Sequence, residues 1–248
     1  MRYLFIINTL FILQFNAIAQ KKISYGIGID LFQTKLNNID RESFSGYGHS
    51  VPDFTQSDKL GFGLNGLIRI PIYKTLGIET GLGFTRYSSH FHFQYKHFFT
   101  QSWVDARFNI GLQYIKVPFN FYYDFRLSKK SSFNVSCGMN IRLLLWVNDD
   151  LEETMVEEIG LPKKPKRYER ILYGYSGSLS YRYNLNDKNR IELGLSFARD
   201  INPMVNNKPK YPENFGFYAN LHEATYSQFG IFLNYFPPWF VSSQTTLN

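Results

Sequence analysis

One stretch decides the fold, FNVSCGMNIRL from Phe133 to Leu143. Its apolar residues alternate strictly with polar or small residues, so a β-strand would place the two kinds on opposite faces. The polar face carries a charge, Arg142, whereas the apolar face carries none. A strand of this kind separates two different surroundings, one apolar and one polar.

Seven further stretches repeat this alternation, and their apolar faces are also free of charge. They cover residues 23–31, 60–72, 78–85, 115–125, 173–183, 191–197 and 229–235. Beyond residue 20 the chain has no apolar run of the roughly 18 residues that a helical membrane span requires. The sequence therefore predicts an all-β fold of eight antiparallel strands.

The connections between these strands alternate between long and short. Long segments, at about 37–58, 91–109, 147–170 and 201–224, follow the first, third, fifth and seventh strands. Tight turns at 74–77, 127–131 and 186–189 follow the second, fourth and sixth strands. All long loops then leave one end of the sheet. This pattern predicts an eight-stranded antiparallel up-and-down transmembrane β-barrel with short periplasmic turns and four long extracellular loops, and it differs from a Greek-key sandwich.

The alternation alone leaves the direction of the two faces open, because a soluble barrel would turn its apolar face inward. An eight-stranded barrel is just wide enough inside for side chains, and so many Phe, Tyr, Ile and Leu residues would overfill it. Aromatic residues also gather near strand ends, where the girdles of membrane barrels lie. We therefore expect the apolar face to contact lipid, with girdle residues Tyr73, Tyr122, Tyr123, Phe125, Trp146, Tyr181, Tyr183, Tyr235 and Phe236.

The opposite face then fills the barrel with nearly balanced bases and acids. We expect these residues to form ion pairs that plug the lumen, and a proton or small-ion path along them is the alternative. A porin-like channel is disfavoured, because aqueous lumens belong to barrels of about 16 strands. The predicted lumen network comprises Asp30, Arg69, Glu79, Lys116, Asp124, Arg142, Arg182 and Glu192.

The two ends of the chain fall outside the predicted barrel. Arg2, an apolar run and the pattern Ala17-Ile18-Ala19 indicate a signal peptide over residues 1–19. Residues 20–236 would form the barrel, and residues 237–248 a periplasmic tail. The expected location is the outer membrane of a Gram-negative bacterium. The net charge of +7 comes from scattered bases, so no nucleic-acid partner is expected, and nothing implies a cofactor.

Several short motifs resemble a known family. LQYIKVPF from Leu112 to Phe119 looks like the Tyr-Leu-Glu-Ile-Pro-Leu signature of the PorT-like outer-membrane β-barrels of Bacteroidota, with Lys116 where that family often has an acid. SCGM from Ser136, LGLS from Leu193 and GIFLNYF from Gly230 are similar to its later strands. The resemblance covers most of the chain after the signal. It implies an outer-membrane barrel that belongs to an envelope assembly, such as a secretion complex.

Candidate chemistry is sparse. His90 and His92 share a strand face, with Ser88 nearby. Imidazoles at this spacing could share a metal ion, and a serine and histidine pair near the outer leaflet could act on the acyl chains of lipopolysaccharide. No acid is spaced to orient either histidine, so the favoured interpretation is a set of exposed polar residues. A lipid-modifying hydrolase or acyltransferase remains the alternative function.

The third long loop has an unusual distribution of charge. An acidic segment precedes a basic one, which would suit contact with lipopolysaccharide or with another envelope protein, although charge runs are commonly just solvated. The prediction is a non-enzymatic small barrel that acts through its loops or as an accessory subunit of an envelope complex. The candidate loop residues are Asp149, Asp150, Glu152, Glu153, Lys163, Lys164, Lys166 and Arg167.

Overall fold

The computed structural model describes residues 23–37, 54–96, 103–150, 168–186, 189–203 and 225–237. No helix in these segments is long and apolar enough to cross a bilayer. The predicted signal peptide and the tail after Pro237 lie outside the described residues. The strands are β1 (Ser24–Asn37), β2 (Phe54–Asp58), β3 (Leu60–Pro71), β4 (Leu76–Lys96), β5 (Trp103–Arg126), β6 (Ser131–Asp149), β7 (Ile171–Asn184), β8 (Arg190–Asp200) and β9 (Thr225–Phe236).

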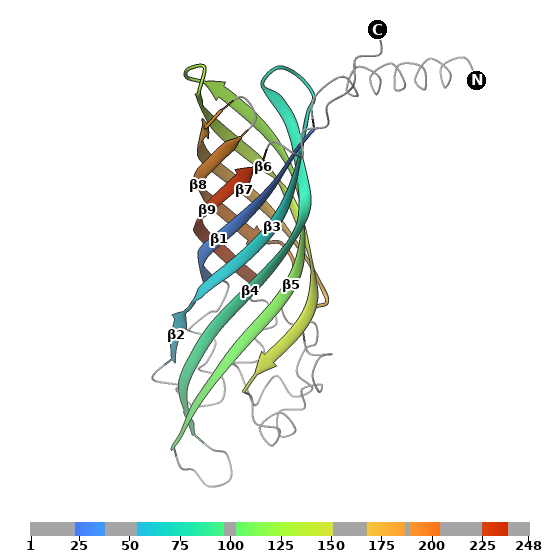
Figure 1. Ribbon diagram of the computed structural model, residues 1–248. Helices are drawn as coiled ribbons and strands as arrows, with labels where there is room; N and C mark the ends of the chain where they lie inside the picture. Colours follow the sequence, from blue (N-terminus) through green and yellow to red (C-terminus); the bar gives the residue numbers. More distant parts are fainter. Residues whose placement is uncertain are drawn as a thin grey trace, which may run out of the picture.

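The strands close into one antiparallel barrel (Figure 1). Its wall runs in the order β1, β3, β4, β5, β6, β7, β8, β9, and β9 pairs again with β1. The short β2 continues the line of β3 along β4 after a shift of one residue, since Asp58 pairs with Ser89 but Phe62 pairs with Arg86. The predicted eight-stranded up-and-down barrel is confirmed. Closure gives each of the eight wall strands a neighbour on both sides, which removes the open sheet edges of the wall.

Tight turns join the strands at one end of the barrel. Backbone hydrogen bonds close them, for example from the Leu127 amide to the Ser131 carbonyl at 3.0 Å and from the Leu185 amide to the Asn189 carbonyl at 3.0 Å. We call this the turn end, and the opposite end the loop end. In Figure 1 the turn end is at the top, and the start of β1 and the end of β9 lie there as well.

The apolar face of each of the eight wall strands looks outward. Leu143 and Ile231 are 42% and 51% exposed, whereas Arg142, between two outward neighbours, is 1% exposed. In water this arrangement would be unfavourable, because burial of apolar surface is the main favourable contribution to folding. In hydrocarbon it is favourable, and the same surroundings require the closed hydrogen bonding of a barrel.

One predicted connection is wrong. Residues 91–109 were expected to form a long loop, but β4 and β5 stay paired as far as Lys96 and Trp103. Beyond the apolar layer both faces of a strand meet water, so apolar and polar residues no longer need to alternate and the strand cannot be recognised by that pattern. The aromatic residues of this segment, which favour extended backbone, are the remaining signal.

Two of the predicted girdle residues lie inside the barrel instead. Tyr122 is 6% exposed and Phe236 is 3% exposed. Each shares the face of inward polar neighbours, Asn120 and Asn234, so the alternation itself places them inward. The face on which an aromatic residue lies therefore predicts whether it points to lipid or into the lumen better than its position near a strand end does.

Candidate functional site

The interior of the barrel holds three layers of polar and aromatic side chains. The layer nearest the turn end is centred on Arg69 of β3. Its guanidinium lies 2.6 Å from the Glu79 carboxylate and 2.7 Å from that of Glu192. Its Cζ atom also lies 4.7 Å from the centre of the Phe236 ring and 5.3 Å from that of Tyr122. Two carboxylates and two aromatic rings thus satisfy one buried cation.

Arg182 of β7 extends this layer across the barrel. It lies 2.6 Å from the Asp124 carboxylate and 3.9 Å from that of Glu192. Ser180 donates a further hydrogen bond to Glu192, and the Asn134 amide donates one to Asp124 at 2.7 Å. Strands on opposite sides of the wall are therefore linked through the lumen. We call this set the turn-end network, with members Arg69, Glu79, Asp124, Arg182 and Glu192.

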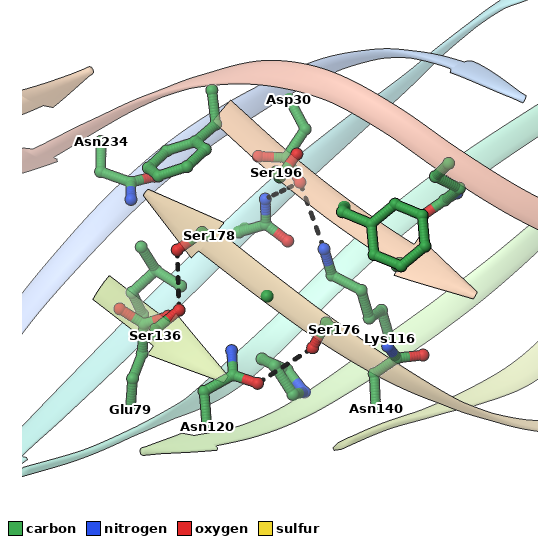
Figure 2. A pocket seen from close by; sticks show the side chains of 18 of the residues that line it. Asp30, Glu79, Lys116, Asn120, Ser136, Asn140, Ser176, Ser178, Ser196 and Asn234 are labelled. Carbon is green, nitrogen blue, oxygen red and sulfur yellow. Dashed lines mark hydrogen bonds and ion pairs between the residues drawn. The ribbon is translucent and has the colours of Figure 1, made fainter. Parts of the chain in front are cut away.

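The middle layer is polar and less densely packed. Lys116 lies 3.2 Å from the Asp30 carboxylate, and Asn65 donates to the same group at 2.8 Å. Two further bonds join side chains of different strands, at 2.7 Å between the Ser136 and Ser178 hydroxyls and at 3.0 Å from Ser176 to Asn120 (Figure 2). A cavity of about 90 Å³ remains among them. It has room for several water molecules.

The layer toward the loop end combines an arginine with tyrosines. Arg142 of β6 pairs with Asp200 of β8 and donates a hydrogen bond to the hydroxyl of Tyr87. The Tyr87 ring stacks on Tyr226 with 5.3 Å between centroids and meets the edge of Tyr114 at 5.5 Å. All five side chains are at most 3% exposed. They block the lumen on the side of the long loops.

The structure brings the predicted lumen residues together. All eight of them point inward, and each joins at least one ion pair. Asp200 was missed, because it lies just past the predicted end of its strand. The inward tyrosines were missed because aromatic residues were expected on the apolar face. Continuing the alternation of β4, β5, β8 and β9 past the apolar layer places the missed residues inward, Tyr87, Tyr114, Asp200 and Tyr226.

The candidate serine and histidines lie on the outward face of β4, beyond its apolar segment. Ser88, His90 and His92 are all half-buried. The Nδ1 atom of His90 lies 2.9 Å from the side-chain oxygen of Asn109. Within the described segments, no group of three or more His, Cys, Asp or Glu side chains is arranged to hold a metal ion. The three residues share a face, and His90 contacts the side-chain amide of Asn109.

Only part of the charged third loop belongs to the described residues. Asp150 accepts a hydrogen bond of 2.6 Å from the Asn109 amide, and Asn109 accepts one of 3.1 Å from Lys59. These contacts tie the base of the loop to the β4–β5 hairpin. The backbone of Asp149 closes β6, and the other candidate loop residues, within 151–167, lie outside the described residues.

Comparison with known proteins gives the family. A search of curated proteins finds no match. The solved structures that resemble this chain include Neisserial surface protein A, at 10% identity and a TM-score of 0.42, covering 86% of this chain and 98% of that one. OprG of Pseudomonas aeruginosa is 13% identical, with a TM-score of 0.43 and coverage of 88% and 98%. The outer membrane protease OmpT of Escherichia coli is 12% identical, with a TM-score of 0.36 and coverage of 87% and 95%.

Similarities this remote say nothing about a substrate or a partner. The family match is broader, since residues 18–206 fit the family described as "Outer membrane protein beta-barrel domain". That span is well over half of the chain and includes seven of the eight strands of the wall. The chain belongs to this outer-membrane β-barrel family and is located in the outer membrane of a Gram-negative bacterium.

Proposed function

We propose that this protein is a non-enzymatic barrel that acts through its external surface, as an accessory or structural subunit of an envelope complex. In barrels of this class the short turns face the periplasm, so the turn end is periplasmic and the loop end is external. The observation that carries the proposal is the contrast between a blocked interior and a hairpin that extends beyond the wall.

The side chains that fill the interior of the described barrel support a lumen without a passage. The turn-end network and the tyrosine layer around Arg142 close the lumen at two levels, and the cavity between them is small. Opening a path would require breaking buried ion pairs, at a cost of about 3 to 5 kcal/mol for each unpaired charge. Transport through the lumen is therefore a poor account of function.

The β4–β5 hairpin, in contrast, is much longer than a membrane span requires. A tilted strand crosses the hydrocarbon with about 9 to 11 residues, whereas β4 has 21 residues and β5 has 24. Their outward apolar faces end near Arg86 and Gln113, which pair with each other. The paired strands continue from there to Lys96 and Trp103, below the rest of the wall in Figure 1. This extension supports a surface that contacts other molecules.

Outward cations at the external boundary favour contact with lipopolysaccharide. Arg86 and Lys59 are exposed beyond the apolar face of the wall. Their charges suit the phosphate groups of the outer leaflet. Lipopolysaccharide would then surround the base of the hairpin and leave its tip available to a protein neighbour.

For the partner, we infer a component of an envelope assembly such as a secretion complex. The support is the sequence similarity of residues 112–119 to the PorT-like barrels of Bacteroidota. The N-terminal segment, residues 1–19, would direct export as a signal peptide. A lipid-modifying enzyme is the less favoured alternative, because a serine nucleophile is activated by a base within hydrogen-bond reach. Among the described residues no hydrogen bond joins Ser88 to His90, which contacts Asn109.

Crosslinking in the native membrane tests the proposal. Residues 151–167 are replaced by a Gly/Ser segment of equal length, which keeps the spacing of β6 and β7 and removes the charges. We expect the variant to fold and to reach the outer membrane but to lose crosslinks to neighbouring envelope proteins. A matched replacement of residues 204–220 in the fourth loop serves as the control. If crosslinks are unchanged in the first variant, or equally lost in the control, the proposed contact of the charged third loop with envelope proteins is wrong.

A further inference from the structure

A second, separate pocket opens at the periplasmic mouth of the barrel. It has a volume of about 260 Å³ and lies at the turn end of β6, β7 and β8, beside the β5–β6 and β7–β8 turns. Four cations line it, Lys129, Lys130, Arg182 and Arg190. The remaining lining residues are neutral and polar, Ser132, Asn184 and Asn186. No carboxylate of the described residues is part of this lining.

The register explains why these residues meet. Ser132 pairs with Arg182, and Asn184 pairs with Arg190, so three adjacent strands place their last inward side chains around one opening. The turn between β5 and β6 adds Lys129 and Lys130 at the rim. The rest of the β7–β8 turn, Asp187 and Lys188, has no net charge and lies outside the described residues.

The charges of this pocket are only partly compensated. Arg182 is shared with the turn-end network, where Asp124 offsets it. Lys129, Lys130 and Arg190 form no ion pair with any residue that the structure describes. About three positive charges thus lie around one opening. Lys129 and Lys130 are exposed, so water and salt weaken their repulsion, and an anion bound between the cations would remove it.

A second observation points to a ligand. Arg182 is 5% exposed, and its Nε and Nη2 atoms donate no hydrogen bond within the described part of the chain, although Nη2 lies 3.9 Å from the Glu192 carboxylate. A buried guanidinium N–H without an acceptor is costly, and such groups are normally satisfied. Arg182 also lines the pocket, and because these two nitrogens are closed off from solvent, an anion seated in the pocket would stabilise this guanidinium through its charge.

We propose that this pocket binds a phosphate group from the periplasmic side. Phosphate offers several acceptor oxygens to arginine guanidinium groups and to lysines. Its charge of up to about −2 offsets the uncompensated positive charge of the pocket better than the single charge of a carboxylate does. The group would belong to a phospholipid of the inner leaflet or to a soluble phosphate. This site is independent of the external role proposed above.

The test uses the full mature chain, folded in a nonionic detergent. Inorganic pyrophosphate binding is measured by calorimetry, and phosphatidylglycerol binding by native mass spectrometry. The site variant is Lys130→Gln with Arg190→Gln. The control variant is Lys74→Gln with Arg126→Gln, which removes the same charge at the same end, outside the pocket. We expect the site variant to bind about tenfold more weakly or worse, and the control to bind like the wild type.

The pattern of binding identifies the source of the phosphate. Binding of pyrophosphate alone indicates a soluble phosphate, binding of phosphatidylglycerol alone indicates a lipid headgroup, and either result with loss in the site variant supports the pocket. Absence of both, equal loss in the control, or equal binding of citrate would overturn the proposal. Should the Arg190 variant fail to fold, Lys129→Gln with Lys130→Gln in the exposed turn gives the same test.

Discussion

Replacing Arg69 by methionine tests the turn-end network directly. Arg69 is 5% exposed and is shared by Glu79 and Glu192. Methionine keeps much of the side-chain volume and removes the charge. Glu79 then has no ion-pair partner among the described residues, and Glu192 keeps only the more distant Arg182.

The expected loss of stability follows from this geometry. Removing one member of a buried ion pair costs about 3 to 5 kcal/mol, because the remaining charge is left without compensation in a medium of low polarity. We expect Arg69→Met to lower the free energy of unfolding by that amount. A second change, Glu79→Gln, removes the stranded carboxylate, so the double variant should recover part of the loss.

The matched control is Lys116→Met in the middle layer. Lys116 and its partner Asp30 are farther apart and more exposed, with side chains 22% and 14% accessible. We expect a loss of about 1 kcal/mol there, because water partly screens and solvates this pair. Urea unfolding in lipid vesicles, followed by tryptophan fluorescence, measures each variant. The reasoning is refuted if Arg69→Met costs no more than Lys116→Met, or if Glu79→Gln deepens the loss.

Three further predictions concern the wall, the outward face and the lumen. Gly138→Ala should prevent folding, since its Cβ would collide with a carbonyl oxygen of β5. Gly177→Ala should be tolerated, because the nearest atom to its Cβ would lie 3.4 Å away. The yield of folded barrel after membrane insertion measures the difference between the two variants. Ser88→Ala and His90→Ala should leave the acylation of lipid A in cells unchanged, as read by mass spectrometry, and an altered acyl pattern would favour the enzyme. In planar bilayers the folded protein should show no stepwise conductance, because three layers of side chains fill the lumen; porin-sized steps would count against a plugged interior.

Much of the fold could be predicted because a membrane barrel imposes two different solvents on the two faces of each strand. Arg142 and Leu143 are adjacent in sequence, yet one is buried among tyrosines and the other faces outward. A slip of one residue would exchange them and turn the arginine toward lipid, at a cost of up to about 2 to 4 kcal/mol, which is the value at the membrane midplane. Such a penalty, repeated along eight strands, makes the register readable from sequence.

The prediction failed where this contrast between solvents ends. The outer half of the β4–β5 hairpin has water on both sides, so its alternation carries no information about burial. The inward Tyr87, Tyr114 and Tyr226 were missed for a different reason. The polar face was expected to hold small and charged residues, but a lumen wide enough for side chains also accepts aromatic rings whose hydroxyls meet an arginine.

The candidate site was predictable as a set of residues and not as a set of pairs. Charge balance across the strands indicates ion pairing in general. It does not say that Arg69 bridges β4 and β8, because that contact depends on how far each strand is displaced along the barrel wall. The basic pocket at the periplasmic mouth was missed because Lys130 and Arg190 are 60 positions apart and meet only after β6, β7 and β8 are paired.

Cys137, the single cysteine of the chain, allows the most direct test that the apolar face contacts lipid. It is exposed on the outward face of β6, between Ser136 and Gly138. A nitroxide attached to Cys137 in lipid vesicles should relax faster with oxygen, which concentrates in hydrocarbon, than with a water-soluble nickel complex. Faster relaxation by the nickel complex would place this face in water and contradict the orientation of the whole barrel.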